Sequence, residues 1–214
     1  MSTDPVVYVI DDDASSRKAV SRLLRSAGLA VETLASAREF LERPAEDRPS
    51  CLVLDIRMPG PSGMDLQAAL QEAQRDIPIV FVTGHGDVST GVRAMKGGAV
   101  DFLEKPFRGE DLLACVQRGL ARSQQGRVER SERAAIERRF ATLTARERDV
   151  LRLVVTGMLN KQIAGELGIA EQTAKIHRSH MTQKMEAGSV VELIQMVRKL
   201  GPGASQRSLR ARWF

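Results

Sequence analysis

The sequence predicts an α/β domain with a doubly wound, five-stranded parallel sheet, followed by a small all-α helix-turn-helix domain. In the first half of the 214-residue chain, short apolar runs alternate with helical segments, which is the pattern of parallel strands joined by helices. Around residue 160 a short helix, a glycine turn and a longer helix follow one another. Charge divides similarly, with 15 Lys+Arg and 18 Asp+Glu in residues 1–122 but 17 and 9 in residues 123–214. An acidic first half and a basic second half favour a signal-sensing unit joined to a nucleic-acid-binding unit.

Five short runs are the predicted strands of the first domain. The runs that are apolar throughout and bounded by turn residues indicate strands buried on both faces of a parallel sheet. The strands are expected over residues 6–10, 30–34, 51–54, 78–83 and 100–104. Helices are expected over residues 14–28, 35–42, 63–73, 87–96 and 109–122, with Ser62 and Asp87 as caps of the third and fourth.

Chemically useful side chains stand where these strands end. Asp11 and Asp12 follow the first strand, Asp55 follows the third, Thr83 ends the fourth and Lys105 follows the fifth. Ligands of such sheets bind beyond the carboxyl ends of the strands, so these groups are expected to share one pocket. Clustered carboxylates repel one another unless a cation lies among them, and Mg²⁺ suits carboxylate and phosphoryl oxygens. Asp55 can then attack phosphorus to form an aspartyl phosphate, with Lys105 neutralising charge and Thr83 donating a hydrogen bond.

Over residues 4–122 the first domain resembles the receiver domain of two-component response regulators, the CheY-like family. The residues that match are Asp11-Asp12, Asp55-Ile-Arg-Met-Pro-Gly60, Thr83-Gly-His-Gly-Asp87 and Phe102-Leu-Glu-Lys-Pro106. The resemblance implies a flavodoxin-like fold and phosphorylation of Asp55 by a partner sensor histidine kinase.

The same resemblance implies a set of roles inside the pocket. Mg²⁺ is expected on Asp11, Asp12 and Asp55 together with the backbone carbonyl of Arg57. Lys105 is expected to contact the phosphoryl group, and Thr83 and Phe102 to be the switch residues that move when phosphate arrives.

Residues 123–141 lack an apolar stripe and are rich in Arg, Glu, Ser and Gln. Two interpretations stay open for this linker: a solvated helix supported by pairs such as Glu129 and Arg133, or a flexible segment. Residues 202–214 follow the breakers Gly201 and Pro202 and turn basic, which indicates a disordered tail.

The second domain is expected over residues 142–201. Thr144 and Glu147 have the spacing of a capping box that opens a helix running to Gly157. A short helix over 160–167, a turn at Gly168 and a longer helix over 171–185 complete the helix-turn-helix pattern.

The longer helix has two distinct faces when projected at 100° per residue. Ala174, His177, Met181 and Met185 share one side, which is expected to pack inward. The opposite side carries polar residues with the large apolar Ile176 among them, which suits contact with a thymine methyl group, and Lys175 beside it can reach phosphate or guanine.

Residues 142–200 resemble the LuxR-type helix-turn-helix of the FixJ/NarL response regulators. The matching runs are Leu143-Thr-Ala-Arg-Glu-Arg-Asp-Val-Leu151, Asn160-Lys-Gln-Ile-Ala164, Leu167-Gly-Ile169 and Thr173-Ala-Lys-Ile-His-Arg178. The DNA-binding residues expected from the projection and the resemblance are Lys175, Ile176, Ser179, Arg178, Thr173, Lys161 and Thr144. Two positions depart from the family pattern: Ser179 is basic in some relatives, and Gly188 stands where Arg is frequent.

Together these features predict a transcription regulator that binds double-stranded promoter DNA once Asp55 is phosphorylated, and we expect it to be an activator. A homodimer is expected on phosphorylation, and RNA polymerase is a further candidate partner. An enzyme, specifically a Mg²⁺-dependent phosphatase, is disfavoured because the chain has no substrate domain and no second Asp two residues after Asp55. A phosphorylation-independent DNA-binding regulator is the remaining alternative.

Composition points to the cytoplasm and away from membranes. No apolar run approaches the ~20 residues that a spanning helix needs, and the first residues lack the basic and apolar regions of a signal peptide. The two cysteines, Cys51 and Cys115, lie in apolar segments and are expected to be buried thiols.

Overall fold

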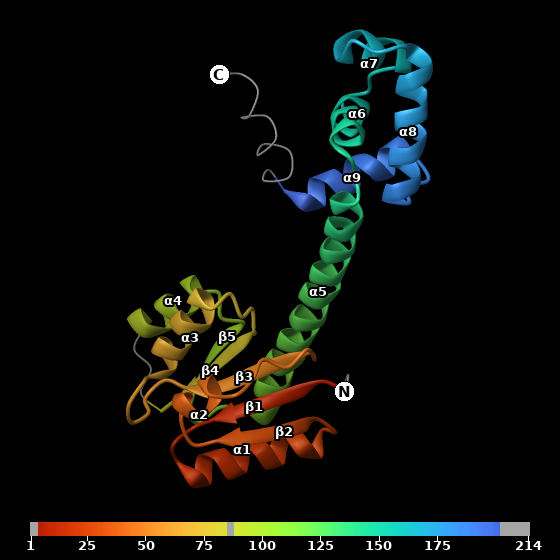
Figure 1. The fold of residues 1–214 in the computed structure, drawn as a ribbon. Coiled ribbons are helices and arrows are strands. Elements are labelled where there is room, and N and C mark those ends of the chain that lie inside the picture. The colour runs from red at the N-terminus through yellow and green to blue at the C-terminus, as the bar shows by residue number, and fades with distance from the viewer. Residues whose placement is uncertain (1–3, 85–87, 202–214) are drawn as a thin grey trace. The chain divides into compact units, whose positions relative to one another are not determined.

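The computed structural model of the chain describes residues 4–84 and 88–201. It divides into two compact units, residues 1–128 and 129–214, which are taken in turn (Figure 1). The expected cap at Asp87 and the expected tail over 202–214 lie outside the described residues.

The first unit is built on a five-stranded parallel sheet in the order β2-β1-β3-β4-β5. Its strands are β1 Val6–Ile10, β2 Ala30–Leu34, β3 Ser50–Asp55, β4 Ile79–Thr83 and β5 Asp101–Glu104. Strands β1, β3 and β4 are buried along their whole length, as their apolar sequences predict. The predicted α/β fold class is therefore confirmed. The fourth and fifth strands begin one residue later than expected, and the third is one residue longer at each end.

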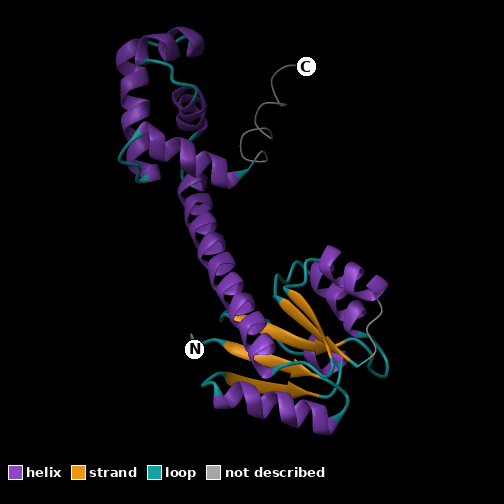
Figure 2. Ribbon diagram, turned by 180° about the vertical axis from the view of Figure 1, so that it is seen from behind, coloured by secondary structure: helices purple, strands orange, loops and turns teal. Residues whose placement is uncertain are grey.

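Helices cover both faces of this sheet (Figure 2). They are α1 Ala14–Ser26, α2 Ala37–Leu41, α3 Gly63–Glu72, α4 Val88–Lys96 and α5 Gly109–Ala141. The alternating side chains of the strands contribute to two apolar clusters. One contains Phe40 of α2, Leu66 of α3 and Ala94 of α4, and the other contains Leu24 of α1 and Leu112 of α5. Each strand thus packs against helices on both faces of the sheet. This packing holds in place the edge of the sheet at which the strands end.

Helix α5 continues beyond the point where the sequence pattern ends it. The predicted end was Arg122, whereas the observed helix continues to Ala141, so the helical interpretation of 123–141 is the one that the structure shows. Long-range contacts hold the first part of this segment: Ser50 N donates to Ser123 Oγ at 3.0 Å, and Arg127 pairs with Asp47 at 3.0 Å. Local periodicity cannot reveal such contacts, because their partners lie more than seventy residues away.

In the described part of the second unit, up to residue 201, every regular element is a helix. Its helices are the end of α5 with α6 Ala145–Val155, α7 Asn160–Leu167, α8 Glu171–Met185 and α9 Val190–Leu200. Their inward faces form one apolar cluster that includes Val150, Leu151, Ile163, Ala174, Met181, Met185 and Leu193. Gly168 ends α7 with a φ of 63°, a conformation that glycine adopts without steric strain. Within the described residues, no helix combines the length and hydrophobicity required to cross a membrane.

The capping box predicted at the start of α6 is present. Thr144 Oγ1 accepts a hydrogen bond from Glu147 N at 3.3 Å, and Glu147 Oε2 accepts one from Thr144 N at 2.8 Å. The same Oε2 also accepts a hydrogen bond from Lys184 Nζ of α8 at 2.7 Å. Burial would raise the pKa of Glu147, but the hydrogen bonds from Lys184 and Thr144 outweigh it and lower that pKa. The buried carboxylate of Glu147 therefore joins α6 to α8, the helix expected to read DNA.

Candidate functional site: an acidic pocket and an exposed helix face

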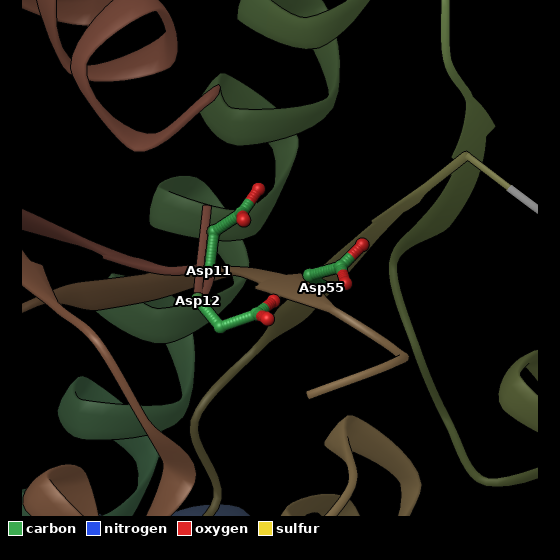
Figure 3. Close-up of side chains that lie close together, drawn as sticks. All are labelled: Asp11, Asp12 and Asp55. Atoms are coloured by element: carbon green, nitrogen blue, oxygen red, sulfur yellow. The ribbon is translucent and has the colours of Figure 1, made fainter. Parts of the chain in front are cut away.

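Three carboxylates meet at the edge where β1 and β3 end. Strand β1 pairs with β3 so that Ile10 faces Leu54, which puts the next residues, Asp11 and Asp55, side by side. One ligand atom from each of Asp11, Asp12 and Asp55 lies within 4.8 Å of the others (Figure 3). Asp11 and Asp55 are buried and Asp12 is exposed, so the cluster opens to solvent on one side.

Asp55 is held in an environment that disfavours its charge. Desolvation by burial raises the pKa of Asp55, Lys105 counteracts this, and Asp11 adds to the increase. The backbone N–H of Arg57 donates to Asp55 Oδ2 at 3.2 Å. A carboxylate in this position is stabilised as an anion when positive charge enters the pocket.

A glycine allows the loop after Asp55 to lie close to the next helix. Gly63 is the first residue of α3, and its N–H donates to the carbonyl of Ile56 at 3.0 Å. A Cβ atom on Gly63 would overlap the backbone carbonyl of Asp55. The amino-acid sequence gives no sign of this role of Gly63, because the close approach depends on the tertiary fold.

Lys105 reaches the same pocket from the end of β5. Its backbone N–H donates to the carbonyl of Thr83 at 2.8 Å, which anchors the residue beside β4. Its ammonium lies 2.7 Å from Asp11 Oδ2 and 3.6 Å from Asp55 Oδ1. The predicted convergence of Asp11, Asp12, Asp55 and Lys105 is thus present in the fold.

Two further residues predicted for the site, Thr83 and Phe102, lie in the neighbouring strands β4 and β5. Thr83 ends β4 and is buried, and Asp55 pairs in register with its neighbour Val82. Phe102 lies half-buried in β5, where its ring is within van der Waals reach of a Cβ added to Gly91 of α4. Phe102 therefore lies between the sheet core and α4, and its switch role stays a prediction.

In the second unit, α8 exposes the face that was predicted to read DNA. Ala174, Met181 and Met185 are buried, whereas Lys175, Ile176 and Ser179 are exposed, which is the division that the helical projection predicts. His177, expected inside, is only half-buried because it lies at the border of the two faces.

The remaining predicted DNA-contacting residues lie near helix starts or along α8. Lys161 and Thr144 are exposed at the beginnings of α7 and α6, and Thr173 is half-buried. Arg178 Nη1 donates to Asn160 Oδ1 at 3.0 Å, so part of its guanidinium already holds α8 against the start of α7. Arginine has five N–H donors, so other donors of Arg178 are left for a phosphate.

Comparison with known families identifies both units. The family described as "Response regulator receiver domain" matches residues 7–117, and the family described as "Bacterial regulatory proteins, luxR family" matches residues 141–197.

Relatives span almost the whole chain. Nodulation protein W of Bradyrhizobium diazoefficiens is 48% identical over 204 residues, covering 95% of this chain and 90% of its own length. The response regulator protein TodT of Pseudomonas putida is 42% identical over 195 residues, covering 91% and 86%. The solved structure of the response regulator StyR is 48% identical with a TM-score of 0.81, covering 92% of this chain and 99% of that one. The chain therefore belongs to the two-component response regulators that join a receiver domain to a LuxR-type DNA-binding domain and regulate transcription.

Proposed function

We propose that this response regulator accepts a phosphoryl group on Asp55 from a sensor histidine kinase and then binds promoter DNA as an activator of transcription. The observation that carries the proposal is the position of Asp55: buried at the end of β3, among two further carboxylates and 3.6 Å from the Lys105 ammonium. In the transfer, a carboxylate oxygen of Asp55 forms a bond to phosphorus while the bond from phosphorus to the kinase histidine breaks.

The donor set suits Mg²⁺. Carboxylate oxygens from Asp11, Asp12 and Asp55 lie close enough to share one hard cation, and we propose the carbonyl of Arg57 as a further ligand. When bound, Mg²⁺ would neutralise charge on the transferred group. Among the chain's own groups, the Arg57 N–H donates to Asp55 Oδ2 and the Lys105 ammonium lies 3.6 Å from Asp55 Oδ1. We propose that Lys105 contacts one phosphoryl oxygen and that the Thr83 hydroxyl donates a hydrogen bond to another.

We propose that the face formed by α4 and β5 couples phosphorylation in the pocket to dimerisation. A groove there is lined by Val88, Gly91, Val92, Met95 and Phe102, together with Lys96, Asp101 and Glu104. Val88, Val92 and Met95 are exposed. Movement of Thr83 and Phe102 on phosphorylation would reshape this face, and two receivers would then pair through it, presenting two recognition helices to two half-sites.

For DNA recognition we propose base contacts from Lys175, Ile176 and Ser179 and phosphate contacts from Arg178, Thr173, Lys161 and Thr144. The exposed positions of most of these side chains support the assignment.

For the domain boundaries we propose a receiver over 4–122, a linker over 123–141, a DNA-binding domain over 142–201 and a basic tail over 202–214. RNA polymerase contact, a cytoplasmic location and the absence of enzymatic activity on small substrates belong to the same proposal.

The test is covalent labelling with acetyl phosphate and Mg²⁺, followed by intact mass measurement. We expect one added phosphoryl group on the wild-type protein, none on Asp55→Asn, and normal labelling of the control Asp111→Asn on the exposed start of α5. A stable adduct in Asp55→Asn would refute the acceptor assignment. Replacing Asp12 by Ala should leave the fold intact and raise the Mg²⁺ concentration that labelling requires.

A further inference from the structure

Ser16 is a pocket residue that the predicted site did not include. It is the third residue of α1, and its backbone N–H donates to Oδ1 of the capping residue Asp13 at 2.7 Å. This cap fixes the Ser16 backbone at the start of the helix. Its half-buried side chain turns back toward the end of β1.

The Ser16 hydroxyl closes a ring of three hydrogen bonds. Ser16 Oγ donates to Asp11 Oδ2 at 2.6 Å, and Lys105 Nζ donates to Ser16 Oγ at 2.9 Å. Lys105 Nζ also donates to the same Asp11 Oδ2 at 2.7 Å. The other oxygen of Asp11, Oδ1, accepts a hydrogen bond from Asp13 N at 2.9 Å. Both oxygens of Asp11 are therefore occupied by donors of the chain itself.

The ring holds the Lys105 ammonium closer to Asp11 than to Asp55. Its distances to Asp11 and Ser16 are those of hydrogen bonds, whereas Asp55 Oδ1 is 3.6 Å away. Lys105 has to approach the group carried by Asp55 to neutralise it, and this approach weakens or breaks the contact with Ser16.

We propose that Ser16 is a positioning residue that holds Lys105 on the Asp11 side of the pocket and thereby slows phosphorylation of Asp55. The inference rests on the proposed function, since it concerns the same transfer. Without the hydroxyl, Lys105 loses one of its resting partners. The ion pair with Asp11 cannot compensate by shortening, because 2.7 Å is already the distance of a charge-assisted hydrogen bond.

The first experiment measures the rate of labelling by limiting acetyl phosphate in full-length Ser16→Ala, Ser16→Thr and Ser15→Ala. Loss of one hydrogen bond to the charged ammonium corresponds to a rate about tenfold or more higher in Ser16→Ala. Ser16→Thr keeps a hydroxyl and should return toward the wild-type rate. Ser15→Ala makes the same change on the neighbouring exposed residue and should match the wild type. An unchanged or slower rate in Ser16→Ala would overturn the proposal.

The second experiment does not depend on phosphorylation. The ammonium signal of Lys105 in ¹⁵N-lysine-labelled protein, assigned by its loss in Lys105→Arg, should show slow proton exchange in the wild type and in Ser15→Ala. It should exchange faster in Ser16→Ala, and equal exchange would contradict the positioning role. If the wild-type protein takes no label on Asp55 while the exchange difference is present, the proposed function fails and the Ser16–Lys105 contact is still established.

Discussion

The carboxylate of Glu147 should be the polar group on which the DNA-binding module depends most. A single oxygen, Oε2, accepts hydrogen bonds from Thr144 N at 2.8 Å and from Lys184 Nζ at 2.7 Å, and the side chain is only 4% exposed. Loss of a cap interaction costs about 1 kcal/mol and loss of a hydrogen bond to a charged group about 1.5–3 kcal/mol. Glu147→Ala should therefore lower the free energy of unfolding of the DNA-binding module by about 2.5–4 kcal/mol.

The Glu147→Gln substitution removes the charge of the side chain but keeps its shape. The amide oxygen can still accept both hydrogen bonds, but charge-assisted bonds are about twice as strong as neutral ones, so a loss of about 1–2 kcal/mol is expected. Because the fold lowers the pKa of Glu147, its charged form contributes stability above the ordinary glutamate pKa of about 4.3. That contribution disappears as the pH falls through the lowered pKa, so the difference between wild type and Glu147→Gln should shrink there.

Hydrogen exchange read peptide by peptide in the full-length protein is the suitable assay, because one unfolding curve would mix the two units. Peptides from α6 and α8 should lose protection in both variants, and peptides from β1 and β3 serve as the internal control. Equal protection of α6 and α8 in wild type and Glu147→Ala would refute this account of the module, as would an equal loss in the receiver.

Three further predictions concern the pocket loop, the cysteines and the DNA-reading face. Gly63→Ala should destabilise the receiver by about 1–3 kcal/mol and slow labelling of Asp55, since its Cβ would overlap the Asp55 carbonyl; an unaltered unfolding midpoint and labelling rate would argue against that contact. Burial raises the pKa of Cys51 to about 12 and that of Cys115 to about 11, so native protein at pH 8 should react with iodoacetamide only slowly and denatured protein rapidly; rapid native labelling would show the thiols to be accessible. Lys175→Ala should weaken binding by about 1–3 kcal/mol at one base position, and Ile176→Ala only at operators with A·T at its contact; equal losses on specific and random DNA would assign base reading to another surface.

The sheet was predictable because its strands carry their own signal. The runs that became β1, β3 and β4 are apolar on both faces, and such runs favour buried parallel strands. Residues at the ends of parallel strands then converge by topology alone, which is why Asp11, Asp55 and Lys105 could be grouped from the sequence. The capping box at Thr144 is equally local, and it was confirmed.

The unpredicted features depend on distant partners. Ser123 and Arg127 belong to a segment without an apolar stripe, and their contacts to 47–50 exist only once the sheet is formed. Ser16 could be placed only after Asp13 was known to cap α1, and its partner Lys105 lies 89 residues away in the sequence. Gly63 had no local signal at all, because the atom it avoids is a carbonyl of the preceding strand.

The most direct test of the central claim is the DNA affinity of the full-length protein before and after treatment with acetyl phosphate and Mg²⁺, on an operator obtained by binding-site selection and at fixed salt concentration. If phosphorylation on Asp55 pairs two receivers, binding to two half-sites should strengthen by about tenfold or more in the wild type and not in Asp55→Asn. The same affinity with and without treatment would contradict the account and identify a regulator that binds DNA independently of phosphorylation.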